Sequence, residues 1–180
     1  MLKTRNRLAL SILLHTIACV AVMLAQDSKP KSPPGQATLT FADGKTVTVD
    51  YSRPSMRNRK IFGGLVPYDQ VWRTGANAAT TLKTDVALNI GGTKVPAGSY
   101  TLYTLPGVNS WQLIINKQTG QWGTHYDQSQ DLARIPMQVK QRPSGLELFT
   151  ISFEKTGGDS AILKLEWENT IASVVVKEQK

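Results

Sequence analysis

The chain has 180 residues, the length of one ordinary domain and too short for two. Hydrophobic residues make up 41% and charged residues 19%, a balance typical of a folded globular protein and not of a disordered one. Lysine and arginine number 21 against 13 acidic residues, which gives a net charge of +8. One cysteine and two histidines exclude an internal disulfide and a zinc site built from such ligands, so we expect no metal and no cofactor.

The N-terminus has the layout of an export signal. Lys3, Arg5 and Arg7 precede a largely apolar stretch at residues 8–25, as in a secretory signal peptide. We therefore predict a signal helix and an exported protein, periplasmic or extracellular, with no stable membrane insertion after cleavage. Two alternatives stay open: an uncleaved N-terminal membrane anchor, since these 18 residues approach the ~20 that span a bilayer, and a lipoprotein modified at Cys19.

Three consecutive regions are predicted: a signal peptide at residues 1–25, a disordered Pro/Ser/Lys tether at residues 26–36, and a single β domain at residues 37–180. The tether has three prolines and almost no apolar side chain, a composition typical of a linker. Removing the signal takes away three basic and no acidic residues, so the net charge falls to +5. Part of the basic excess therefore belongs to targeting.

Beyond the tether, apolar residues repeat with a period of two. Val47, Val49 and Tyr51 alternate with polar residues and follow an Asp-Gly turn at residues 43–44, a β-hairpin signature that pairs them with residues 37–41. Further strands are expected at residues 79–84, 86–90, 99–105, 111–116, 149–153, 163–167 and 174–176. Beyond the signal no window has a helical apolar stripe, although residues 127–134 could form a helical turn or two. The pattern favours an all-β domain, an antiparallel β-sandwich of about nine or ten strands.

A long irregular segment at residues 51–81 interrupts this alternation. Such a segment inside a compact domain is usually functional or specially packed. Its five basic residues oppose a single acid, Asp69, which gives a local charge of +4. The basic residues are Arg53, Arg57, Arg59, Lys60 and Arg73. Glycines and prolines flank the basic run, so we expect the segment to hold a fixed shape.

Short motifs spread over the mature chain carry a family resemblance. They are Tyr51-Ser-Arg-Pro, Arg59-Lys-Ile-Phe-Gly, Leu65-Val-Pro-Tyr, Val71-Trp-Arg-Thr-Gly-Ala-Asn, Ile90-Gly-Gly, Pro96-Ala-Gly-Ser-Tyr and Trp122-Gly. Through them the chain resembles the bacterial exported family known as domain of unknown function 2911. The family pattern usually has Gly where this chain has Asn58 and Glu where it has Ala78. The resemblance implies an exported, mostly β domain and supplies no catalytic residues.

The run from Trp72 to Asn77 is the sharpest candidate for a site. An indole face, a guanidinium and a side-chain amide together can hold a planar or polyhydroxy ligand. A scaffold interpretation is favoured over it, with Trp72 in the core, Arg73 paired with a buried carboxylate and Asn77 capping a turn, because buried polar groups normally serve one another. The candidate ligand-binding residues are Arg53, Lys60, Tyr68, Trp72, Arg73, Asn77, Thr80, Trp122 and His125. Trp111 and Trp167 continue the alternation and are predicted in the core.

Three functions are carried forward. The first is a noncatalytic binding domain for a carbohydrate, another cell-envelope component or an anionic small ligand. The second is a carboxylate-based hydrolase that uses Arg73 as an electrostatic clamp; Glu166 and Glu168 could supply two carboxylates, although alternation on an outer face explains them more simply. The third is a structural protein in which Arg53 and Arg73 lie in buried ion pairs. Nucleic acid is not expected, because acidic residues populate the later strands.

Overall fold

The computed structural model describes residues 32–180, which form nine strands and one short 3-10 helix, Gln128–Gln130. The predicted signal helix lies outside the described residues, as does most of the predicted tether. No helix in the described part of the chain has both the length and the apolar character needed to cross a bilayer.

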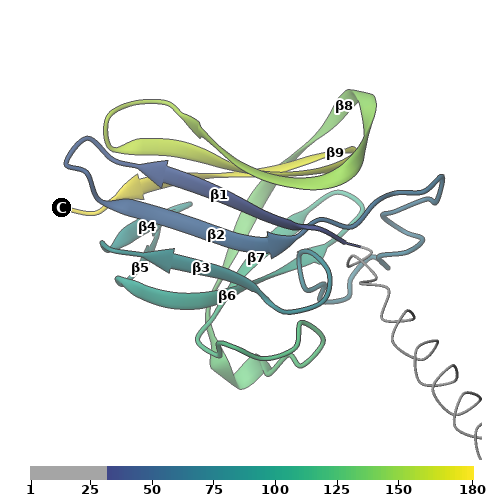
Figure 1. Ribbon diagram of the computed structural model, residues 1–180, viewed down its shortest axis with the longest axis horizontal. Helices are drawn as coiled ribbons and strands as arrows, with labels where there is room; N and C mark the ends of the chain where they lie inside the picture. Colours follow the sequence, from purple (N-terminus) through teal and green to yellow (C-terminus); the bar gives the residue numbers. More distant parts are fainter. Residues whose placement is uncertain (1–31) are drawn as a thin grey trace, which may run out of the picture. The chain divides into compact units, whose positions relative to one another are not determined.

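All strand pairs are antiparallel, in the order β1-β2-β3-β6-β7-β8-β9-β4-β5 (Figure 1). The strands are β1 (Pro34–Thr40), β2 (Thr46–Ser52), β3 (Thr80–Thr84), β4 (Leu88–Ile90), β5 (Thr93–Val95), β6 (Gly98–Pro106), β7 (Trp111–Asn116), β8 (Asp131–Lys155) and β9 (Ser160–Glu178). This confirms the all-β, antiparallel class. The division into two packed sheets stays a prediction, because the nine strands follow one another in a single hydrogen-bonded order.

The length of β8 lets the sheet turn back on itself. Its first part, to Met137, pairs with β7, and its remainder pairs with β9 across two register shifts. The second part of β8 comes back beside β1 (Figure 1). There the Tyr51 hydroxyl donates to the Ile151 carbonyl at 3.3 Å and accepts from the Ile151 amide at 2.9 Å. These two bonds tie β2 to β8 over the core.

The core is built from the inward-facing positions that the period-two pattern predicts. Four of these positions are fully buried. They are Val47 and Val49 on β2, Leu102 on β6 and Leu113 on β7. Trp111 and Trp167 are 3% and 1% exposed, which confirms their predicted core positions.

Two predicted boundaries need correction. β1 begins at Pro34, inside the predicted tether, because Gly35 lies under the side chains of Tyr51 and Arg53, where a Cβ would come within 2.9 Å of both. The polar composition of residues 34–36 therefore belongs to an edge strand. Of the helical turn predicted at residues 127–134, only the 3-10 helix forms. The chain then becomes β8, because Ile135 and its alternating neighbours pair with β7.

Candidate functional site

The irregular segment contains no regular strand between Ser52 and Thr80, in agreement with the sequence. It divides into two parts with different supports. Residues 53–69, here the basic half, dock on β8 through an isolated bridge between Ser55 and Leu148. Residues 70–80, here the threonine half, dock on β6 and on the chain at residues 121–123.

Arg53 connects the start of the basic half to β8. Its Nε donates to the Phe149 carbonyl at 3.2 Å and its Nη2 to Thr150 Oγ1 at 2.9 Å, while the Phe149 amide donates to the Pro54 carbonyl. No ion pair of Arg53 forms within residues 32–180, so the buried ion pair expected by the structural hypothesis is wrong for this residue. Its guanidinium serves the scaffold.

The middle of the basic half is held by apolar burial. Ile61, Phe62 and Val66 are 0%, 4% and 4% exposed, and the amides of Ile61 and Phe62 donate to Glu168 Oε2 at 3.3 and 3.4 Å. The neighbouring Lys60 is exposed. Glu168 is thereby a structural acceptor and not part of an open carboxylate pair.

Glu166 has a partner of its own. It accepts from Arg142 Nη1 at 2.7 Å, and both side chains are largely buried. The two glutamates considered for glycoside hydrolysis therefore have separate structural partners.

Tyr68 packs inward beside the core. A Cβ on Gly63 would come within 2.5 Å of the Tyr68 ring, and Gly63 has a φ of +78°, so glycine is required there by both space and backbone. Tyr68 is therefore a packing residue of the basic half.

Trp72 belongs to an aromatic cluster. Its ring centroid lies 5.0 Å from that of Phe149 and 5.8 Å from that of Trp167, the latter in a stacked arrangement. Its amide and carbonyl both pair with Thr104 of β6. The structure thus places Trp72 against the core, as the scaffold interpretation predicts, and not as an open platform.

Three buried threonines fix the shape of the threonine half. Thr74 Oγ1 lies 3.1 Å from Thr104 Oγ1, and Thr80 Oγ1 donates to the Thr74 carbonyl at 2.8 Å; all three residues are 0% exposed. Thr74 and Asn77 have φ values of +53° and +59°, a strained region for a β-branched residue above all. The buried hydrogen bonds stabilise this backbone, and they place Thr80 out of reach of a ligand.

Arg73 and Asn77 support the chain at residues 121–125. The Gly123 amide donates to the Asn77 carbonyl at 3.1 Å, and a Cβ on Gly123 would come within 2.7 Å of Arg73 Cδ. The side-chain amide nitrogen of Asn77, Nδ2, donates to Ser52 Oγ at 3.4 Å. Only glycine at 123 lets the chain approach the arginine stem this closely.

The Arg73 guanidinium is sparsely bonded. Its Nε donates to the Gly75 carbonyl at 3.4 Å, and within residues 32–180 it forms no ion pair and no further hydrogen bond. The expected partner carboxylate is therefore missing from the described residues, which corrects the ion-pair expectation for Arg73. Asn77 has no carboxylate partner there either.

Residues 122–125 form a turn that carries two exposed candidates, and we call it the Trp122 turn. The His125 amide donates to the Trp122 carbonyl at 2.9 Å. The Trp122 side chain is 52% exposed, and His125 is exposed as well. The structure thus brings Arg73, Asn77, Trp122 and His125 to this turn. Among the other candidates, Lys60 is exposed on the basic half. Arg53, Tyr68, Trp72 and Thr80 serve the scaffold.

Sequence reasoning missed the residues that hold this turn from below. The Tyr103 hydroxyl donates to the His125 carbonyl at 3.2 Å, and Gln121 Nε2 donates to the Tyr103 hydroxyl at 3.1 Å and to Thr101 Oγ1 at 3.2 Å. Gln121 Oε1 is buried with no hydrogen-bond partner in the described part of the protein. The neighbouring Trp-Gly motif was the one available signal, since a loop glutamine carries no pattern of its own.

Two departures from the family pattern fall at informative places. Asn58 has a φ of +58°, a region that glycine enters freely and asparagine tolerates better than most residues. Ala78 is exposed and forms an isolated antiparallel bridge with Trp122. The glutamate of the family pattern would therefore be attached beside the Trp122 turn.

The chain after the turn is fixed by a polar network around Asp131. The Tyr126 hydroxyl donates to Asp131 Oδ2 at 2.6 Å, and burial followed by this bond raises the pKa of Tyr126 to about 12. Arg134 Nε also donates to Asp131, and this bond raises the pKa of Arg134. Ser129 donates to Asp127 and thereby lowers the pKa of that carboxyl. Among residues 32–180, no group of three or more His, Cys, Asp or Glu could hold a metal.

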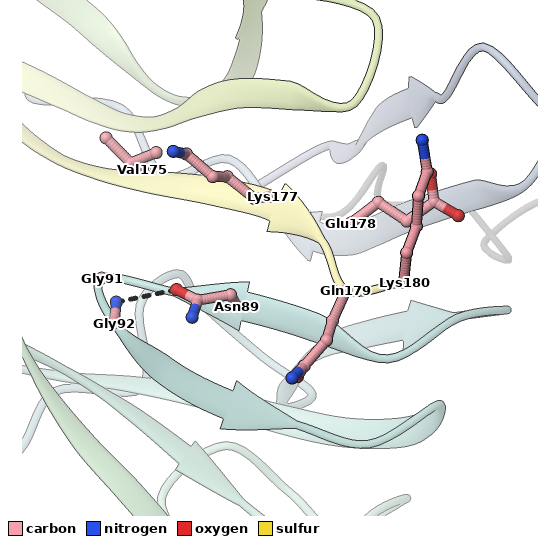
Figure 2. A pocket seen from close by; sticks show the side chains of 8 residues that line it. All are labelled: Asn89, Gly91, Gly92, Val175, Lys177, Glu178, Gln179 and Lys180. Carbon is pink, nitrogen blue, oxygen red and sulfur yellow. Dashed lines mark hydrogen bonds between the residues drawn. The ribbon is translucent and has the colours of Figure 1, made fainter.

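Two shallow hollows lie elsewhere, at the C-terminal end of β9. The larger, about 660 Å³, is lined by Asn89, Gly91, Gly92, Val175, Lys177, Glu178, Gln179 and Lys180 (Figure 2). None of the predicted site residues lines it. Figure 2 shows Glu178 and Lys180 directed to one side of the strand end and Gln179 to the other. The lining mixes two lysines with one glutamate.

Comparison with known proteins gives one match. A family model described as protein of unknown function, DUF2911, matches residues 32–176, which is nearly all of the described domain. No curated protein and no solved structure matches the chain.

Proposed function

The chain belongs to the DUF2911 family of proteins of unknown function, and on that premise we propose that it is an exported, noncatalytic protein that binds carbohydrate at the Trp122 turn. The observation that carries this proposal is the exposure of Trp122. Its side chain is 52% exposed, whereas tryptophan is normally largely buried. An exposed indole offers a flat apolar face with a polar N–H at its edge, which suits the ring of a sugar.

The rigidity of the turn supports binding. Its backbone is held by the Gly123–Asn77 bond on one side and the Tyr103–His125 bond on the other. The threonine half beneath it is fixed by buried hydrogen bonds. A binding residue on a preorganised loop loses little conformational entropy when the ligand arrives.

The surrounding groups supply polar contacts for hydroxyl or acidic substituents. The half-buried Arg73 packs its stem beside Gly123 and has guanidinium donors left over, and His125 is exposed at the other end of the turn. An arginine donor favours an oxygen-rich and in particular a carboxylated ligand. We therefore expect acidic saccharides to bind more tightly than neutral ones.

Titration of the protein with soluble oligosaccharides, neutral and uronic-acid-containing, tests the proposal. Trp122→Ala should weaken binding at least about tenfold, which corresponds to losing roughly 1.4 kcal/mol of contact. Titration calorimetry is the readout, because Trp122→Ala removes the indole that a bound ligand would perturb. In the parent protein intrinsic fluorescence adds a second signal, since Trp111 and Trp167 are buried and Trp72 is packed in the aromatic cluster.

The matched control is Val108→Ala. Val108 is 68% exposed in a different turn, so its truncation should leave saccharide binding unchanged. Arg73→Ala should reduce binding of acidic saccharides more than that of neutral ones. Unchanged affinity of Trp122→Ala, or no binding of any saccharide by the folded protein, would overturn the proposal.

A further inference from the structure

We propose that the basic half presents a docking tip for the surface of an anionic phospholipid bilayer, formed by Arg59, Lys60 and Leu65. None of these residues belongs to the Trp122 turn, so this inference is independent of the proposed function.

The tip is a tight loop that exposes an apolar side chain next to a basic one. The Leu65 amide donates to the Lys60 carbonyl at 3.1 Å, and the Gly64 amide donates to the Ile61 carbonyl at 3.2 Å. A Cβ on Gly64 would come within 2.6 Å of the Lys60 carbonyl oxygen, so the loop is this tight only with glycine there. Leu65 is 46% exposed and Lys60 is exposed beside it.

The loop is anchored by the residues on either side of Leu65. Ile61 and Phe62 precede it and Val66 follows it, and all three are buried in the core. The exposed leucine therefore stands on a rigid base, as an inserting side chain requires.

The turn between β6 and β7 meets the basic half at the exposed Asp69 and carries a second exposed apolar side chain. The Asp69 amide donates to the Pro106 carbonyl at 2.7 Å, which brings this turn against the end of the basic half. Val108, at the tip of the turn, is 68% exposed, more than Leu65 or Trp122.

The charge of the tip is suited to anionic headgroups. Arg59 donates to the carbonyls of Ser55 and Met56, which holds its guanidinium in place without neutralising it. Neither Arg59 nor Lys60 forms an ion pair with any residue in 32–180. The nearby Glu147 accepts from the Arg57 amide instead. Basic side chains around an inserting apolar residue are typical of surfaces that bind anionic membranes.

The described chain begins at the same end of the sheet as the tip. The Arg53 amide donates to the Pro33 carbonyl at 2.8 Å, and Figure 1 shows the irregular segment at the end of the sheet where β1 begins.

Vesicle co-sedimentation of the full chain tests the inference. The measured quantity is the ratio of affinities for phosphatidylcholine vesicles with and without phosphatidylglycerol, since residues 8–25 could bind both kinds. Lys60→Gln should lower this ratio about fivefold, and Arg59→Gln with Lys60→Gln roughly 25-fold, at the usual strength of one basic residue at an anionic surface. Raised salt should lower the wild-type ratio in the same way.

Leu65→Ser tests insertion separately from charge. It should weaken binding to both vesicle types, and in a Cys19→Ser background an environment-sensitive label at Leu65→Cys should report transfer to an apolar medium with anionic vesicles. The matched control is Lys94→Gln, an exposed lysine on β5, which should leave the ratio unchanged. An unchanged ratio in the folded Arg59/Lys60 double variant, or equal loss in the Lys94 variant, would overturn the inference.

Discussion

The two halves of the irregular segment are neighbours in the chain but are held by different forces. The basic half is fixed by burial of Ile61, Phe62 and Val66 and by backbone bonds to β8 and Glu168. The threonine half is fixed by hydrogen bonds among buried hydroxyls and carries strained backbone at Thr74 and Asn77. The two halves of one irregular segment therefore depend on different interactions for their shape.

The difference teaches how a loop can present exposed side chains without becoming mobile. In the basic half, buried apolar side chains hold a tight loop at the surface, because their burial in the core supplies most of its stabilisation. A polar network tolerates unusual backbone angles because each buried group has a partner. We therefore expect the two halves to respond differently to substitution.

The largest effect is expected from the apolar anchor. Phe62→Ala should lower the free energy of unfolding by about 3–5 kcal/mol, because it removes a ring that contacts Trp72, Trp111 and Trp167. Urea denaturation measures the loss. Leu65→Ala, on the exposed tip of the same loop, is the control and should stay within about 0.5 kcal/mol of the parent. Similar losses for both variants would contradict an anchored basic half.

A smaller effect is expected from the hydroxyl network. Thr80→Val should cost about 1–3 kcal/mol, because it leaves the Thr74 carbonyl buried without its donor. Thr48→Val is the matched control, since the Thr48 hydroxyl forms no side-chain hydrogen bond within residues 32–180 and should report little change. Equal stability of the two variants would show that the threonine half does not depend on these bonds.

The smallest effect concerns the network around Asp131 and appears only at alkaline pH. The pKa of Tyr126 is about 12 in the folded protein against 10.0 for the free side chain. Because the folded value is the higher one, the contribution of Tyr126 to stability is complete below pH 10 and is lost as pH rises toward 12. Tyr126→Phe should therefore flatten the alkaline decline seen in urea unfolding between these pH values. An identical decline in the variant would contradict this assignment.

The strands could be predicted largely because side chains alternate in a sheet. Residues 47–51, 99–105, 111–116 and 163–167 read as strands from the sequence and lie in β2, β6, β7 and β9. The start of β8 was missed, although Ile135 and Met137 alternate in the same way, because the polar residues before them favoured a turn. β5 is only three residues long, too short to show a period.

The candidate site was less predictable, because loops carry no periodicity. Trp72 and Trp122 both precede a short polar run, yet one packs against Trp167 and the other is half exposed. The different exposure of the two side chains depends on which part of the chain each loop pairs with. Trp72 pairs with Thr104 of β6, whereas Trp122 pairs with Ala78 at the surface. Such long-range pairing cannot be read from the local sequence.

The closure of β2 against β8 also has a consequence for how the chain folds. The two bonds between Tyr51 and Ile151 join positions 100 residues apart. Contacts of such sequence separation form slowly, because a large loop must be closed before they stabilise anything. The contact between Tyr51 and Ile151 therefore forms late, because Ile151 lies in the last third of the chain whereas the hairpin of β1 and β2 lies near its start.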